Sequence, residues 1–118
     1  MKPIIYQLLP RTFTNYNETR KPHGSKEENG CGTFALITPK ALKAIVDLGA
    51  THVWYTGVIR HATAEFNTPS ITKGKAGSPY AITDYYDVDP DLSNDPEKRM
   101  AEFEALVRRT HKAGLKVV

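Results

Sequence analysis

The feature that most constrains the fold is an alternation of short apolar segments with two amphipathic helical patterns. Segment 4–9 (IIYQLL) is a nearly unbroken apolar run between Pro3 and Pro10, as expected for a strand buried on both faces. Segment 51–56 (THVWYT) is rich in β-branched and aromatic residues, and 115–118 (LKVV) is also strand-like. The sequence therefore predicts three strands.

The segments between these strands carry start and stop signals for helices. The first predicted helix runs from Pro39 to Gly49, and the second runs from Pro96, capped by Asp95, to Gly114. Apolar residues recur at helical spacing within both, so each helix has one face suited to burial. These residues are Leu42, Ile45, Val46, Met100, Phe103, Leu106 and Val107.

The element order strand, helix, strand, helix, strand predicts an α/β fold with a parallel sheet and right-handed crossovers. Three short strands covered by two helices would leave strand edges and an apolar face open. We therefore expect 1–118 to be part of a larger domain, truncated within its third strand, and capable of self-association through open strand edges.

Composition excludes several classes of protein. The 118 residues include 16 basic and 13 acidic ones, a net charge of +3 spread among both signs, so no nucleic-acid partner is predicted. No apolar run has the length of a signal peptide or a membrane span, so no membrane partner is predicted either. Because Cys31 is the single cysteine, no internal disulfide can form and the cellular location is left open.

Two long polar connections are predicted. Segment 15–33 is rich in Asn, Lys, Glu and Gly with little periodicity, and segment 57–94 contains three prolines and is too irregular for one helix. Within the second, the run 77–90 (GSPYAITDYYDVDP) gathers three tyrosines and three carboxylates. Flat aromatic faces and carboxylate acceptors can hold a sugar, although such runs also pack loops against their own domain.

Four segments together resemble the start of the alpha-amylase catalytic domain of glycoside hydrolase family 13. They are 5–13 (IYQLLPRTF), 51–57 (THVWYTG), 80–90 (YAITDYYDVDP) and 114–118 (GLKVV), and the resemblance covers essentially the whole chain. It implies that residues 1–118 are the N-terminal portion of a (β/α)8 barrel, with the first two β/α units and the opening of the third strand. Segment 57–94 would be the loop after the second strand, on the catalytic face.

The resemblance also implies a substrate-binding role for Tyr80 and Asp84. Tyr80 matches a tyrosine whose ring stacks on the glucose unit at the point of cleavage, and Asp84 and Tyr86 match the continuation of that loop, with Asp84 chiefly supporting the platform. Ala81 stands where relatives that trim single units have an aspartate, which favours internal cleavage. The implied partner is an α-glucan or maltooligosaccharide.

No catalytic residue is predicted within this chain. Cleavage with retention needs a carboxylate nucleophile and a second carboxyl group as acid and base. The family carries them on its fourth and fifth strands, beyond Val118, so we expect the isolated chain to be inactive. Calcium is possible in the full-length parent, but segment 15–32 lacks the acidic spacing of a calcium loop and the four histidines show no metal-binding spacing.

The remaining polar and aromatic candidates have plainer interpretations. Turn formation or solvation explains Asp87 and Asp89, a surface role explains His61, and Trp54 is expected in the barrel core. An alternative function uses no chemistry at all: a carbohydrate-binding module that contacts sugar through Tyr80, Tyr85 and Tyr86.

Overall fold

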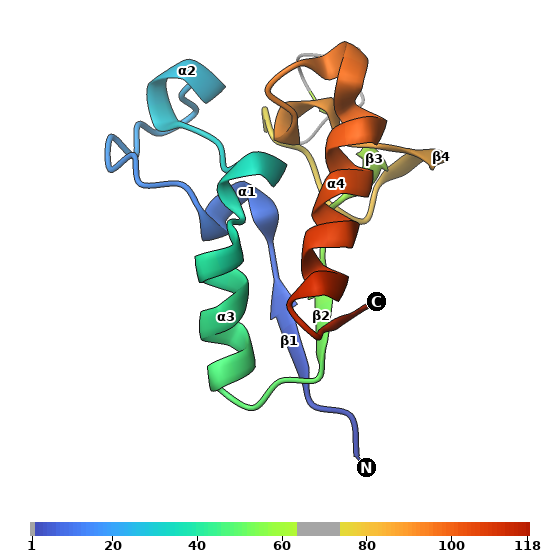
Figure 1. The fold of residues 1–118 in the computed structure, drawn as a ribbon. Coiled ribbons are helices and arrows are strands. Elements are labelled where there is room, and N and C mark those ends of the chain that lie inside the picture. The colour runs from blue at the N-terminus through green and yellow to red at the C-terminus, as the bar shows by residue number, and fades with distance from the viewer. Residues whose placement is uncertain (1, 64–73) are drawn as a thin grey trace.

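The computed structural model describes residues 2–63 and 74–118, which form the α/β arrangement in Figure 1. In chain order the strands and α-helices are β1 (Ile5–Leu8), α1 (Pro10–Phe13), α2 (Lys26–Asn29), α3 (Pro39–Asp47), β2 (His52–Tyr55), β3 (Ile59–His61), β4 (Ile82–Val88), α4 (Arg99–Lys112) and β5 (Lys116–Val117). The described residues also form the 3-10 helices η1 (Phe34–Leu36), η3 (Pro90–Leu92) and η4 (Pro96–Lys98).

The three predicted strands form one parallel sheet in the order β1-β2-β5. Ile5 is paired with His52, and Val53 with Val117. Helix α3 connects β1 to β2, and α4 leads into β5, so the predicted α/β class is confirmed.

The sheet is buried on one face, not on both as segment 4–9 suggested. Leu8, Val53 and Tyr55 are buried against the helices, whereas Ile5 is 51% and Trp54 is 41% exposed. Alternate side chains of a strand point to opposite faces, so these two sets lie on opposite sides of the sheet. Trp54 therefore lies on the face of the sheet that the helices do not cover, which is the inner face in a (β/α)8 barrel, and its placement in a barrel core stays a prediction.

The core fills the space between the sheet, α3, α4 and η1. Phe34 is fully buried and packs on Phe103 of α4, with ring centroids 5.6 Å apart. Other apolar side chains around them are fully or almost fully buried, namely Ile37, Leu42, Ile45, Leu106 and Leu115. Burial of the apolar helix faces is the main contribution to the stability of this core.

The helix starts follow the predicted capping residues with one difference. The Thr38 side chain accepts a hydrogen bond from the Ala41 N–H, and α3 begins at Pro39 as predicted. Asp95 caps in the same way, through the Glu97 N–H, but the first turn after it is the 3-10 helix η4. Helix α4 therefore begins at Arg99, and the predicted start at Pro96 was three residues early.

The two predicted loops contain more structure than expected. In segment 15–33, Ser25 and Glu28 form a reciprocal capping box around the single turn α2. In segment 57–94, β3 and β4 pair antiparallel as a two-stranded sheet, and η3 follows directly. Residues 64–73 of this segment lie outside the described part of the chain.

Within the described ranges, no helix is both long and apolar enough to cross a membrane.

Candidate functional site

Tyr80, Asp84 and the charged residues near them lie at the end of the parallel sheet where β1 leads into α1. In Figure 1 this end also carries α2 and the β3–β4 pair, and it is opposite the N-terminus. The ends of β1 and β2 are joined there, because Gln7 Nε2 donates a hydrogen bond of 2.9 Å to Thr56 Oγ1. The carboxyl ends of parallel strands commonly form binding sites in α/β proteins.

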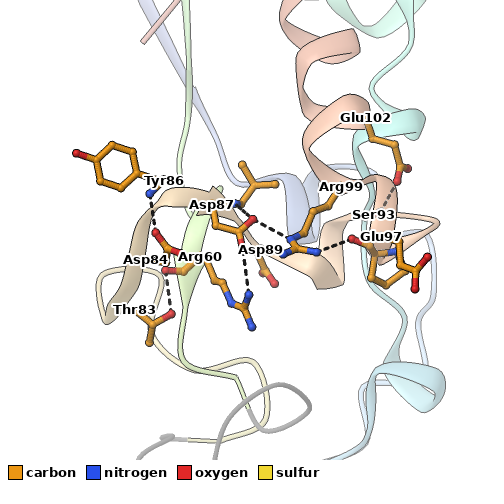
Figure 2. Close-up of polar contacts among 12 residues, drawn as sticks. Arg60, Thr83, Asp84, Tyr86, Asp87, Asp89, Ser93, Glu97, Arg99 and Glu102 are labelled. Carbon is orange, nitrogen blue, oxygen red and sulfur yellow. Dashed lines mark hydrogen bonds and ion pairs between the residues drawn. The ribbon is translucent and has the colours of Figure 1, made fainter.

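The Asp87 carboxylate joins three elements at this end of the sheet. Figure 2 shows it between Arg99 and Arg60. Arg99 donates from Nε at 2.8 Å and from Nη2 at 2.9 Å, and Arg60 donates from Nη1 at 2.9 Å. These hydrogen bonds, chiefly those from Arg99, outweigh partial burial and hold the pKa of Asp87 well below its ordinary value.

Two further carboxylates, those of Asp89 and Asp91, connect the same end of the sheet to Arg11 in the segment after β1. Arg11 Nη2 lies 2.6 Å from Asp91 Oδ2 and 3.4 Å from Asp89 Oδ2. Asp89 is fully buried, and its carboxylate also accepts the Asp91 N–H at 3.0 Å. Burial raises the pKa of Asp89 in spite of these partners.

These contacts correct the predictions for three polar residues. Asp89 forms a turn as expected, but neither it nor Asp87 is solvated, because both are buried in ion pairs. His61 is 4% exposed and has no surface role: its Nδ1 lies 3.0 Å from the Ile59 carbonyl oxygen and its Nε2 lies 3.6 Å from Asp89 Oδ2. Arginine partners distant in the sequence offset the cost of burying the two carboxylates, and nothing in the local sequence indicates them.

Tyr80 is presented to solvent by a short turn before β4. Its side chain is 72% exposed. Its backbone N–H donates to Ser78 Oγ at 3.3 Å, and the Ala81 N–H donates to the Ser78 carbonyl at 3.0 Å. The Tyr80 ring therefore offers an open apolar face on a backbone that Ser78 holds in place.

Asp84 lies four residues farther on, within β4, and is exposed. Its Oδ1 accepts the Tyr86 N–H at 2.8 Å (Figure 2). The structure thus places both predicted binding residues on one hairpin, Tyr80 as an exposed ring and Asp84 as a carboxylate engaged with the backbone. Their predicted roles toward a sugar stay predictions.

An open cavity of about 450 Å³ lies beside the hairpin, and neither Tyr80 nor Asp84 lines it. The charged residues of its walls are Arg11, Lys26, Glu27, Lys75 and Asp91. Sequence reasoning missed all five, as it missed Arg60 and Arg99. The single available signal was the position of Arg11 directly after the first strand.

In residues 2–63 and 74–118, no three or more His, Cys, Asp or Glu side chains are arranged to hold a metal ion. The metal and calcium predictions remain predictions.

Known proteins resemble this chain over almost its whole length, although no family model matches it. A probable alpha-glucosidase of Rhizobium meliloti is 27% identical over 115 residues, covering 98% of this chain and 16% of the relative. A cyclomaltodextrin glucanotransferase of Niallia circulans is 23% identical with the same two coverages.

Solved structures agree with the sequence relatives. The trehalose-6-phosphate hydrolase of Bacillus licheniformis superposes with a TM-score of 0.60 at 26% identity, over 98% of this chain and 16% of that one. A noncanonic maltogenic alpha-amylase of Thermotoga neapolitana gives a TM-score of 0.61 at 25% identity, over 98% and 21%.

The chain spans 16% of the length of the curated relatives that it matches. The prediction from the four sequence segments is confirmed: in sequence and in structure this chain is similar, over nearly its full length, to alpha-amylase-type enzymes of glycoside hydrolase family 13.

Proposed function

We propose that this chain is part of an alpha-amylase-like glycoside hydrolase that cleaves α-glucosidic bonds in starch or related α-glucans with retention. The observation that carries the proposal is the similarity over 98% of the chain to the maltogenic alpha-amylase and the probable alpha-glucosidase. The three parallel strands with their helices would be the first units of a (β/α)8 barrel. In such barrels the binding residues follow the carboxyl ends of the strands, where the β3–β4 hairpin lies.

In this proposal Tyr80 is the stacking platform for one glucose unit. A sugar ring has an apolar face of C–H groups, which an exposed aromatic ring can cover, while the phenol hydroxyl can bond a sugar hydroxyl. The turn made with Ser78 fixes the Tyr80 backbone before the sugar arrives. Asp84 supports the platform through its bond to the Tyr86 N–H.

The catalytic carboxyl groups are proposed to lie outside this chain. A retaining mechanism needs two carboxyl groups roughly 5 Å apart, one as nucleophile and one as acid and base. The buried Asp87 and Asp89 are poor candidates, because arginines already occupy their oxygens. Their hydrogen bonds serve to hold the hairpin.

Replacing Tyr80 by alanine is expected to weaken binding of maltose to the purified chain about tenfold, because stacking of this kind is worth about 1 kcal/mol or more. Isothermal titration calorimetry or chemical-shift titration would measure the effect. Tyr16→Ala is the matched control, since Tyr16 is 87% exposed and lies outside the hairpin. Equal binding by Tyr80→Ala and Tyr16→Ala would remove Tyr80 from the proposed site.

The purified chain is expected to release no reducing ends from soluble starch, because the catalytic carboxyl groups are proposed to lie outside it. A reducing-sugar assay at high protein concentration, with a known amylase as positive control, would measure this. Activity that co-purifies with the chain and persists after repeated chromatography would contradict the placement of the catalytic groups.

A further inference from the structure

Strand β4 contains a pronounced bulge at its two adjacent tyrosines. Ile59 pairs with Val88 and Arg60 pairs with Asp84, so one step along β3 corresponds to four steps along β4. The excess residues 85–87 therefore leave the regular ladder. Bulges redirect side chains and are frequent beside functional sites.

Both ends of this bulge are fixed by contacts that use neither tyrosine side chain. At one end Asp84 Oδ1 accepts the Tyr86 N–H at 2.8 Å. At the other end Asp87 is held by Arg60 and Arg99. Figure 2 shows the Tyr86 ring pointing away from this ion-paired group. The backbone is thus organised while the ring is left open to solvent.

Packing of the hydrophobic core does not explain why the Tyr85 and Tyr86 rings are exposed. Tyr85 is 77% exposed and Tyr86 is 94% exposed. Tyr55 shows the other arrangement in the same chain: its ring is buried, and its hydroxyl lies 2.7 Å from Thr110 Oγ1. Each exposed tyrosine ring offers an apolar face and a hydroxyl group, the combination that binds ligands with apolar faces and hydroxyl groups.

We propose that Tyr85 and Tyr86, the tyrosine bulge, form a second sugar-contact point that binds a distal part of the α-glucan chain held at Tyr80. The inference rests on the proposed function, which supplies the first contact. Tyr80 and Tyr86 are six residues apart on one hairpin, a separation of at most roughly 20 Å. A short sugar reaches one contact, and an oligosaccharide of several units reaches both. Chain length of the ligand therefore determines affinity.

The test compares maltose with maltohexaose in calorimetric titrations of the full chain. The wild type is expected to bind maltohexaose about tenfold more tightly than maltose, beyond the statistical gain from repeated units. The double variant Tyr85→Ala/Tyr86→Ala is expected to bind maltose like the wild type and to lose most of this preference. Tyr85→Phe/Tyr86→Phe should keep it if stacking dominates. Tyr16→Ala is again the control, and circular dichroism checks that each variant is folded.

The outcomes separate this inference from the proposed function. A double alanine variant that keeps the full preference for maltohexaose overturns the tyrosine bulge, whatever Tyr80→Ala does. A wild type without any length preference overturns it as well. Loss of maltose binding in Tyr80→Ala together with loss of the length preference in the double variant supports both. If Tyr80→Ala leaves maltose binding unchanged, the platform fails, while a length preference lost in the double variant still supports the bulge.

Discussion

Replacing Asp87 by asparagine is expected to lower the free energy of unfolding by about 3 kcal/mol. The carboxylate accepts hydrogen bonds from Arg60, Arg99 and the Val88 N–H, and the variant would leave two arginines facing each other without a negative charge. Urea unfolding followed by circular dichroism at pH 7 would measure the loss. Because Asp87 fixes one end of the bulge, binding of long oligosaccharides should weaken as well.

Asp47→Asn is the matched control, because Asp47 pairs with Lys43 on the surface and both are largely exposed. Its effect should stay within about 0.5 kcal/mol. The pKa of Asp87 is depressed in the folded chain, so its stabilisation is present above the unfolded-state pKa and is lost as pH falls through acid values toward the folded-state pKa. The stability difference between wild type and Asp87→Asn should therefore shrink below about pH 4. A difference that is constant down to pH 2, or no difference at pH 7, would contradict this assignment.

Replacing Phe34 by alanine is expected to destabilise the chain by about 3–5 kcal/mol, a large part of the stability of a domain of this size. Phe34 is fully buried, packs on Phe103 and lies where η1 meets α4. The variant would open a cavity between these elements. Loss of the cooperative unfolding transition, or a midpoint shifted strongly to lower urea, is the expected readout.

Leu36→Ala provides the comparison within the same 3-10 helix, since Leu36 is 48% exposed. Its effect should be about 1 kcal/mol or less. Equal destabilisation by the two variants would show that η1 itself, and not the buried ring, holds this part of the core. We expect the two variants to differ in stability, because Arg109 donates hydrogen bonds to the Phe34 and Ile37 carbonyl oxygens and so holds the η1 backbone in place in both.

The regular elements were predictable because their signals are local. Thr38 and Asp95 are capping residues in both the sequence and the structure, and the strands are the apolar runs. The hairpin was missed because β3 has three residues and its pairing with β4 crosses an irregular segment with two register shifts. A strand of this length has no periodic signal of its own.

The candidate site was likewise predictable only in part. The tyrosine-rich run drew attention to Tyr80 and Asp84 from composition and resemblance, and the structure places both on one hairpin. The burial of Asp87, Asp89 and His61 was not predicted, because Arg99 and Arg11, which pair with Asp87 and Asp89, come from segments after and before the hairpin, and His61 in turn lies against Asp89. A carboxylate pattern alone does not tell solvation from burial in an ion pair.

The amino-acid order by itself determined the three parallel strands, the helices α3 and α4, the capping residues that precede them, and the family resemblance, since each depends on residues close together in the chain. Tertiary structure decided which face of the sheet is covered, which carboxylates are buried and which tyrosines remain exposed. Those properties depend on pairings over long separations, such as Arg11 with Asp91 and Arg60 with Asp87, and local sequence does not encode the distance between such groups.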